Sequence, residues 1–570
     1  MSYSLGQTRP NANPIEHMNT NTRTRHGGQI LVDQLAINGC KTAFCVPGES
    51  YLAALDGLHA HNAIRTIVCR QEGGATMMAD AWAKMTGDVG VAFVTRGPGA
   101  TNAAAGVHIA YQDSTPMILF IGQVDSVAAE REAFQEIDYR RMFGEMAKWV
   151  GQIDDIRRIP EYVSHAFHRA KAGRPGPVVL ALPEDMLAAE AEVEDARPHV
   201  LVEAHAGNED LKSLETALAQ AERPLIMVGG GGWSAQAAAD VGAFAERTQI
   251  PVCSSFRCQD YVDNRNSAYV GHTGIAISTE LAEAVKTSDL LIVMGARLGE
   301  LTTRGYELVD IPNPKQKLVH IHAGAEELGR VYRPDIAINA SAASFARALA
   351  NIKVPDAPVW SKWCADARAA FEADLDPQTT PGDVKLEEII VWLSNHLDEH
   401  AVIANGAGNY SGWIHRYYRF RGYRTQLAPT SGSMGYGVPA AVSAKLAKPD
   451  STVVAIAGDG CFMMTANELA TAVQHDLPII YLVANNSMFG TIRMHQERRY
   501  PGRLSATSLK NPDFAAMARS FGAHGETVTD GADFPDAFAR AQASGKPALI
   551  ELKVDPDALS PRLRLSDLTQ

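Results

Sequence analysis

The sequence predicts an α/β protein made of three doubly wound parallel-sheet domains. Two observations lead to this prediction. Short apolar runs alternate with segments of helical character through most of the 570 residues. Two stretches rich in charge or proline divide this alternation into three blocks. The apolar runs resemble strands that are buried on both faces of a parallel sheet. We detect no sequence repeat among the blocks, and their similar patterns indicate related folds.

These blocks set the domain boundaries that we expect. The acidic, Ala- and Glu-rich stretch 188–208 indicates the first division, and residues 355–383, with four prolines and many charges, indicate the second. The expected segments are a flexible N-terminal arm (1–26), a first domain (27–192), a central domain (193–356), a linker (357–383), a third domain (384–555) and a C-terminal tail (556–570).

Each block contains short apolar runs that we assign to strands. Helical stretches separate them, as in β-α-β units with parallel strands. The expected strands are residues 42–46, 66–69, 91–95, 117–121 and 178–182 in the first block, 224–228, 290–294 and 318–321 in the second, and 401–404, 453–457 and 479–484 in the third.

The composition excludes several classes of protein. With 46% hydrophobic and 21% charged residues the chain is typical globular material, and its net charge of −13 without a basic stripe argues against nucleic-acid binding. No apolar run approaches the ~18 residues of a membrane span, and the polar residues 1–26 lack the apolar core of a secretory signal. The seven cysteines have no CxxC spacing, so we expect buried free thiols in a cytoplasmic protein.

The most informative motif lies in the third block. Gly458-Asp459-Gly460 is followed by 24 residues and then by Asn485-Asn486. Expected strands precede both ends, with helical character between them. The parallel strands of such a unit bring Asp459 and Asn486 to the same edge of the sheet. A carboxylate, an amide oxygen and a backbone carbonyl, here that of Met488, suit Mg²⁺, and the glycines allow the close approach of a phosphate.

This motif resembles the diphosphate motif of thiamine diphosphate (ThDP) enzymes. The resemblance implies that Asp459, Asn486 and Met488 hold a Mg²⁺ ion that bridges to the cofactor diphosphate. The alternative is that Gly-Asp-Gly is an ordinary turn and Asn-Asn an ordinary loop. The strands and the helix around both ends favour the cofactor site.

A second segment points to the same family. Arg70-Gln71-Glu72-Gly73-Gly74 follows the expected strand 66–69 and precedes an Ala- and Met-rich helix expected over 75–85. It resembles the segment that carries the catalytic glutamate of ThDP enzymes, which places that role on Glu72. There a carboxyl group in an apolar setting shares a proton with the aminopyrimidine ring and so helps the thiazolium carbon to lose its proton. The family often has His where Gln71 stands, which leaves a direct role for Gln71 in doubt. The alternative is that Glu72 only complements the helix dipole.

Two glycine-rich stretches complete the expected cofactor site. Residues 405–410 resemble the second loop around the diphosphate, although such turns are common at strand ends. In residues 431–437 glycines surround Met434, which in the family wedges between the two cofactor rings; the alternative is a Met that fills the core. The expected cofactor-binding residues are Pro47, Gly48, Glu72, Gly406, Gly408, Asn409, Tyr410, Ser433, Met434, Gly458, Asp459, Gly460, Cys461, Asn486, Met488, Phe489 and Gly490.

The first block also resembles acetolactate (acetohydroxyacid) synthase. The matches are residues 95–102, 111–116, 122–124 and 133–136. The resemblance implies that Phe134 and Gln135 face the substrate channel and join Glu72 and Met434 as catalytic residues, while Pro47-Gly48 lies over the thiazolium ring. The alternative is that each match, taken singly, is a turn or a packing feature of the scaffold.

Three positions depart from the synthase pattern. His495 stands where the synthase has a tryptophan that selects the second oxo acid, Pro183-Glu184-Asp185 replaces a Pro-Lys-Asp element, and His320-Ile321-His322 replaces an acidic strand end of the flavin-binding domain. Residues 229–232 and 295–297 still suit a dinucleotide cleft. FAD therefore stays open as a ligand, but we expect that catalysis does not need it. The residues left open as substrate contacts are His108, Arg493 and His495.

The resemblance extends over roughly residues 27–555. It implies decarboxylation of a small 2-oxo acid and carboligation of the resulting enamine to a second carbonyl compound. It also implies a homodimer or homotetramer with active sites between subunits. The alternatives are a non-ligating 2-oxo acid decarboxylase, a 2-hydroxyacyl-CoA lyase and, from another class, a catalytically degenerate nucleotide-binding regulator. Intact Asp459, Asn486 and Glu72 speak against the last.

Overall fold

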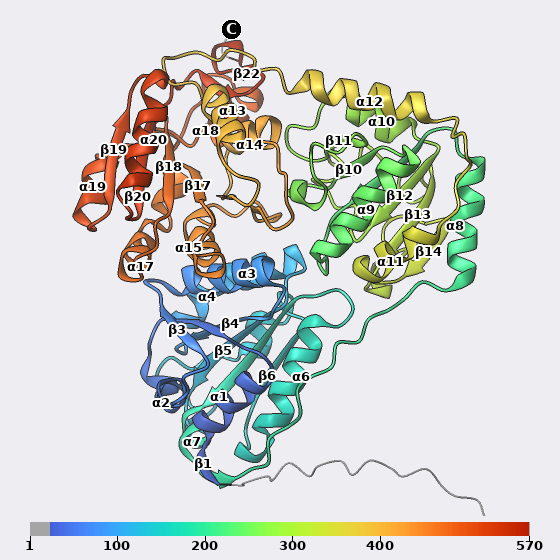
Figure 1. Ribbon diagram of the computed structural model, residues 1–570. Coiled ribbons are helices and arrows are strands. Elements are labelled where there is room, and N and C mark those ends of the chain that lie inside the picture. The colour runs from blue at the N-terminus through green and yellow to red at the C-terminus, as the bar shows by residue number, and fades with distance from the viewer. Residues whose placement is uncertain (1–22, 569–570) are drawn as a thin grey trace, which may run out of the picture.

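The computed structural model describes residues 23–568. This part of the chain forms three six-stranded sheets whose neighbouring strands run parallel. Figure 1 shows them as three lobes in chain order, each with helices packed on its sheet. The predicted α/β class, with three doubly wound parallel-sheet domains, is confirmed.

The first sheet has the order β3-β2-β4-β5-β7-β6. The topological switch point of this sheet lies between the neighbouring parallel strands β2 and β4. The chain leads from β2 to a strand on one side of this point and from β4 to a strand on the other side. The strands are β2 (Thr42–Cys45), β3 (Arg65–Val68), β4 (Gly90–Val94), β5 (Met117–Gln123), β6 (Trp149–Gln152) and β7 (Pro177–Pro183). The helices are α1 (Gly27–Ile37), α2 (Leu52–Ala60), α3 (Glu72–Thr86), α4 (Pro98–Asp113), α5 (Tyr139–Phe143), α6 (Ile159–Lys171) and α7 (Glu184–Ala188).

The third sheet repeats this topology, with the order β16-β15-β17-β18-β20-β19. The strands are β15 (Val402–Asn405), β16 (Gln426–Leu427), β17 (Val453–Gly458), β18 (Ile480–Asn485), β19 (His524–Val528) and β20 (Ala548–Lys553). The helices are α13 (Leu386–His396), α14 (Ser411–Tyr417), α15 (Gly437–Ala447), α16 (Asp459–Met463), α17 (Leu469–Gln474), α18 (Gly490–Arg499), α19 (Phe514–Ser520) and α20 (Phe534–Ala543).

The central sheet has a different order, β11-β10-β9-β12-β13-β14. Counted along the chain this is 3-2-1-4-5-6, the order of dinucleotide-binding sheets. The central sheet is thus related to the other two in class but differs in strand order, because alternation alone does not fix that order. The strands are β9 (Pro224–Val228), β10 (Val252–Ser254), β11 (Tyr269–His272), β12 (Leu290–Met294), β13 (Lys317–His322) and β14 (Ile336–Asn339). The helices are α8 (Asn208–Gln220), α9 (Ala235–Thr248), α10 (Thr279–Thr287) and α11 (Ala342–Ala348).

The segment expected to be a linker, 357–383, contains helix α12 (Ser361–Asp374). Its three prolines all lie outside the helix, one before it and two after it, so they mark its ends and do not argue against it. Trp360 and Cys364 are buried, and α12 packs against α10 and β11 of the central domain. The charged residues of this segment cover the solvent side of a helix.

Both expected chain ends also contain strands. β1 (Thr24–His26) pairs antiparallel with β8 (Glu190–Glu192), so the end of the expected arm belongs to the first lobe. The rest of that arm, residues 1–22, lies outside the described residues. In the expected tail, β21 (Ala558–Ser560) pairs with β22 (Leu563–Arg564).

Helix α3 begins three residues before its expected start. The Gln71 side chain explains this, because its Oε1 accepts the backbone N–H of Gly74 at 3.0 Å and caps the helix. The helix ends at Gly87, whose φ of 82° suits a residue without a Cβ. Glu72 is therefore the first residue of a well-capped helix.

A buried polar cluster joins the first and third domains where α3 packs against α15. Lys84 Nζ lies 2.7 Å from Asp80 Oδ2 and also pairs with Asp113. Tyr436 donates its hydroxyl to Asp80 at 2.6 Å. Loss of one member would leave an uncompensated buried charge, which typically costs about 3–5 kcal/mol. This cluster fixes the two domains of one chain relative to each other.

All seven cysteines are free and buried, which confirms the expected state of the thiols. Among residues 23–568 there is no helix with both the length and the apolar character needed to cross a membrane.

Candidate functional site

The candidate site lies at the topological switch point of the third sheet, between the carboxyl ends of β15 and β17. Open α/β sheets bind ligands in the crevice at such a point. A cavity of about 250 Å³ occupies it. Gly406 and Ser433 do not line this cavity. The predicted residues that do are Gly408, Asn409, Tyr410, Met434, Gly458, Asp459, Gly460, Cys461, Asn486, Met488, Phe489 and Gly490.

Asp459 and Asn486 reach this cavity because β17 and β18 pair in parallel, with Gly458 opposite Ala484. Asp459 is only 2% exposed. Burial raises the pKa of its carboxyl group, and hydrogen bonds from Gly460 and Asn511 oppose the rise. Oδ1 accepts the Gly460 N–H at 2.9 Å. The two carboxylate oxygens offer about four acceptor positions, so the group keeps capacity for a cation.

Asn511, in the loop before α19, is a site residue that the sequence analysis missed. Its Nδ2 donates to Asp459 Oδ2 at 2.6 Å and to Asn485 Oδ1 at 3.0 Å. Asn485 in turn donates to the buried Glu551 at 2.6 Å. Asn485 is thus a structural link, while its neighbour Asn486 lines the cavity. No local pattern marks Asn511, because its partner lies 52 residues earlier in the chain.

Met488 offers the third oxygen that the motif requires. Its carbonyl accepts the N–H of Gly490 at 3.0 Å, and a carbonyl oxygen has a second lone pair to offer. Asn486 Oδ1 accepts the N–H of Met488 at 3.3 Å, which holds the amide close to this turn. The donor set of one carboxylate, one amide and one carbonyl fits a hard divalent cation.

Glycine is required at two places around the cavity by close packing. A Cβ on Gly460 would lie 2.5 Å from the Phe489 ring, and a Cβ on Gly406 would lie 2.6 Å from Cys461 Sγ. Without side chains at these positions the two loops come close together, and glycine-rich loops of this kind suit the close approach of a phosphate. Met434 lines the same cavity from a loop in which Cys461 Sγ accepts the N–H of Gly435 at 3.2 Å.

The second predicted cluster lies at the carboxyl ends of β2, β3 and β4 in the first domain. Glu72 is half-buried, and its Oε2 accepts a hydrogen bond from Asn102 Nδ2 at 3.0 Å. In the described chain an amide side chain contacts the carboxylate, and the apolar setting expected around Glu72 stays a prediction. Glu468 of the third domain accepts the backbone N–H groups of Arg70 and Gln71 at 3.1 and 3.0 Å. The third domain of the same chain thus fixes the segment that precedes Glu72.

Pro47-Gly48 and Phe134-Gln135 lie around the same strand ends. A Cβ on Gly48 would lie 2.4 Å from Thr95 Cβ, and one on Gly97 would lie 2.7 Å from Gln135 Cβ. Arg96 Nε donates to the Phe134 carbonyl at 3.0 Å. Phe134 is 71% exposed, so the described chain covers only a small part of this residue. Its place in a substrate channel stays a prediction.

The two clusters do not meet in one cavity. The residues that line the 250 Å³ cavity all lie between Leu386 and Leu559, in the third domain and the tail. Glu72, Pro47 and Gly48 are therefore absent from the lining that the described chain provides. Within the described chain the two clusters are therefore separate.

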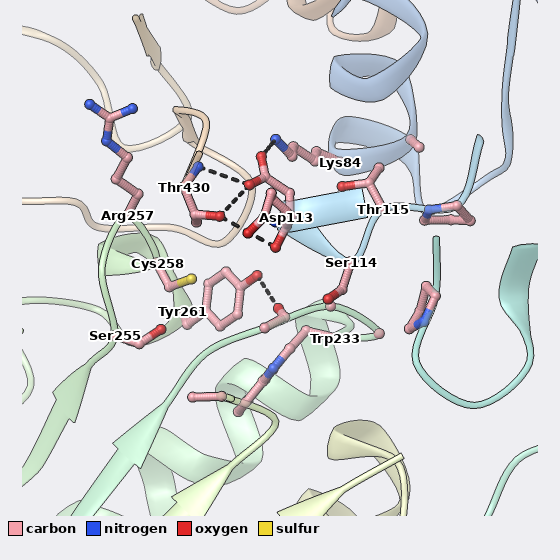
Figure 2. A pocket seen from close by; sticks show the side chains of 18 of the residues that line it. Lys84, Asp113, Ser114, Thr115, Trp233, Ser255, Arg257, Cys258, Tyr261 and Thr430 are labelled. Atoms are coloured by element: carbon pink, nitrogen blue, oxygen red, sulfur yellow. Dashed lines mark hydrogen bonds and ion pairs between the residues drawn. The ribbon is translucent and has the colours of Figure 1, made fainter. Parts of the chain in front are cut away.

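A larger cavity of about 840 Å³ lies where the central domain meets the other two. It lies at the topological switch point of the central sheet, between β9 and β12. The loops after these two strands contribute Gly230–Gly232 and Ala296-Arg297 to its lining. Figure 2 shows Lys84 and Asp113 of the first domain, Trp233 and Tyr261 of the central domain, and Thr430 of the third around it. The predicted dinucleotide cleft corresponds to this cavity.

The departures from the synthase pattern lie in several places. His495 is exposed on α18, and Arg493 pairs with Glu497 at 3.4 Å. His108 lines the larger cavity. Glu184 pairs with Arg96 and does not line that cavity, so this departure lies away from the residues predicted to form a dinucleotide cleft.

His320, on β13, does not line that cavity either. Burial lowers its pKa to about 4, and its Nε2 lies 2.9 Å from the Ala296 carbonyl. A neutral imidazole in this contact donates to the carbonyl. The strand end therefore presents no carboxylate to accept a ribose hydroxyl.

Three family models match the chain in the order of its lobes. They are the thiamine pyrophosphate enzyme N-terminal TPP binding domain over residues 25–142, the central domain over 211–349, and the C-terminal TPP binding domain over 406–552. The chain belongs to the thiamine pyrophosphate enzyme family. This confirms the resemblance found in the sequence motifs.

Several relatives share almost the full length of the chain. The acetolactate synthase large subunit of Corynebacterium glutamicum is 32% identical, covering 93% of this chain and 87% of its own. That of Lactococcus lactis subsp. lactis is 33% identical over 87% of both chains. The probable acetolactate synthase large subunit of Methanocaldococcus jannaschii is 30% identical over 95% of both.

We predict that Asn511→Ala weakens ThDP binding in the presence of Mg²⁺ by about 10- to 100-fold, because outer-shell hydrogen bonds to a metal ligand typically contribute that much. The measurement is a ThDP titration at fixed Mg²⁺ by calorimetry. Asn395→Ala changes an exposed asparagine of the same domain and serves as the control. Equal affinity in the two variants would remove Asn511 from the site.

Proposed function

We propose that this protein is a ThDP- and Mg²⁺-dependent enzyme that decarboxylates a small 2-oxo acid and ligates the remaining acyl unit to a second carbonyl compound. The observation that carries the proposal is the cavity at the carboxyl ends of β15, β17 and β18, where Asp459 and Asn486 lie beside glycine loops. Membership of the thiamine pyrophosphate enzyme family and the acetolactate synthase large subunits among the relatives support the carboligation.

Asp459, Asn486 and the Met488 carbonyl are the proposed Mg²⁺ ligands. The three residues line one cavity, and the buried carboxylate supplies the single negative charge of the set. The loops that contain Gly406–Tyr410 and Gly458–Gly460 would take the diphosphate, because their backbones approach each other without intervening side chains. Met434 would support the bent form of the cofactor from the wall of the same cavity.

Glu72 is the proposed acid–base group. Asn102 binds Oε2, which leaves Oε1 available for a ring nitrogen. When bound, ThDP supplies an electron sink that stabilises the charge left after CO₂ departs. The capped start of α3 and the two hydrogen bonds from Arg70 and Gln71 to Glu468 hold Glu72 at a fixed place. A base that is fixed in this way loses little orientational entropy during proton transfer.

The active unit is proposed to be a homodimer or a larger homo-oligomer. The support is the separation of Glu72 from the cavity that contains Asp459 within one chain. Pairing the first domain of one subunit with the third domain of another would bring the two clusters together. The proposed partners are small molecules, a 2-oxo acid and a carbonyl acceptor.

Flavin is proposed not to be needed for turnover. The reaction as written transfers no net electrons to a second cofactor, and residues 320–322 at the end of β13 include no carboxylate. The 840 Å³ cavity is large enough for a nucleotide. The protein could therefore bind a flavin even though the reaction does not require one.

The first prediction tests the acid–base role. Glu72→Gln should keep ThDP affinity and lose about 10²- to 10⁴-fold in turnover, the usual contribution of a positioned acid or base. Steady-state rates with a panel of 2-oxo acids, with and without aldehyde acceptors, give the turnover and separate ligation product from free aldehyde. Glu161→Gln, an exposed change on α6, is the control. Near-normal turnover in Glu72→Gln would refute the role.

The second prediction concerns flavin. The purified protein should turn over at the same rate with and without added FAD. Visible absorption reports any bound flavin, and the rate reports whether it matters. A stoichiometric yellow cofactor whose removal stops turnover would contradict the proposal.

A further inference from the structure

One segment of the central domain reaches into the third domain. Asp260 Oδ2 accepts the backbone N–H groups of Thr425 and Gln426 at 3.0 and 3.2 Å. Asn264 exchanges two hydrogen bonds with the backbone of Phe420, both 2.9 Å long. These contacts fix residues 257–264 against the strand β16 and the loop before it. Arg257 begins this segment.

Arg257 makes the two contacts of this segment that lie nearest to the proposed cofactor cavity. Its Nη2 donates to the Gly406 carbonyl at 2.8 Å, and its Nη1 donates to the Pro429 carbonyl at 2.6 Å. The residue is 5% exposed. In Figure 2 its guanidinium points away from the cavity drawn there and toward the loops of the third domain. One side chain thus joins two loops that are 23 residues apart in the chain.

Both loops border the cavity that contains Asp459. Gly406 begins the loop that leads to Asn409 and Tyr410, and it lies so close to Cys461 that a Cβ would be 2.6 Å from Sγ. Pro429 begins the loop that ends at Met434, and its carbonyl also accepts the N–H of Gly432 at 3.0 Å. Holding both carbonyls therefore sets the spacing between two walls of the cavity.

The backbone at Arg257 supports a specific role for this side chain. Its φ is 61°, in the left-handed region where a Cβ is unfavourable and glycine is preferred. Strained positions persist when the surrounding contacts hold them, and they gather at functional sites. An arginine at this position has a cost that glycine would avoid. The contacts of its guanidinium offset that cost.

We infer that Arg257 is a positioning residue for the cofactor cavity, and that through it the central domain holds the diphosphate loop and the Met434 loop at the spacing that binds ThDP. The identity of the ligand, ThDP, rests on the proposed function. The spacing of the two loops does not, because it is a property of the protein without cofactor. Arginine suits this task because its planar fork donates to two acceptors at once, whereas lysine carries a single charged nitrogen.

The test uses Arg257→Gly. Glycine accepts the left-handed backbone, so the variant removes the guanidinium while it relieves strain, and it should fold. Gln249→Gly is the matched control, because Gln249 has a φ of 53° and is exposed at the end of α9. Arg257→Lys keeps the charge with one donor group and should lie between wild type and Arg257→Gly.

The first measurement is hydrogen–deuterium exchange of the full-length protein without cofactor. In Arg257→Gly, peptides covering 404–412 and 427–437 should exchange about tenfold faster than in wild type, since loss of a charged donor frees both loops. Peptides from β17 and β18 should not change, and Gln249→Gly should match wild type throughout. Unchanged exchange in both loops would overturn the inference, whatever the fate of the proposed function.

The second measurement is ThDP affinity with Mg²⁺. Arg257→Gly should weaken ThDP binding at least about tenfold relative to wild type. The affinity of Arg257→Lys should lie between those of wild type and Arg257→Gly. Loosened loops with unchanged ThDP affinity would overturn the positioning role. Wild-type protein that binds no ThDP would overturn the proposed function instead, and the exchange result would still decide whether Arg257 holds the loops.

Discussion

The structure depends on one constraint, the burial of parallel strands on both faces. The side chains of such strands are apolar on both faces because helices cover both. Polar functional groups therefore lie at the ends of the strands. In the third domain this brings Asp459 and Asn486 to one cavity. In the first domain it brings Glu72 beside Thr95 and Asn102. The identical strand order of the two sheets produces two half-sites with the same relation to their folds.

The parts of the site predictable from sequence are those whose partners are near in the chain or carry a family motif. The glycines and Asp459 follow a strand that the sequence marks clearly, and Glu72 starts a helix directly after a strand. Asn511 and Arg257 could not be predicted, because their contacts arise from the packing of distant segments. Helix α12 was missed because prolines at its two ends hid it. Strand order in the central sheet also depends on packing that local patterns do not record.

The three domains of one chain have different relations to the proposed site. Buried contacts of Lys84 and Asp80 with Tyr436 join the first and third domains, and Glu468 fixes the backbone before Glu72. The central domain reaches the cavity through Arg257. Each chain therefore presents a fixed third-domain cavity and a fixed glutamate, but they do not share one space. The account requires that two chains complete each other.

Complementation between two inactive variants tests this requirement most directly. Glu72→Gln and Asp459→Ala are co-expressed with different affinity tags, and the oligomer carrying both tags is assayed. Two subunits with different lesions form one site with both defects and one with neither, so the mixed dimer should show about half the wild-type turnover per dimer. A mixed oligomer as inactive as either variant alone would contradict the shared site.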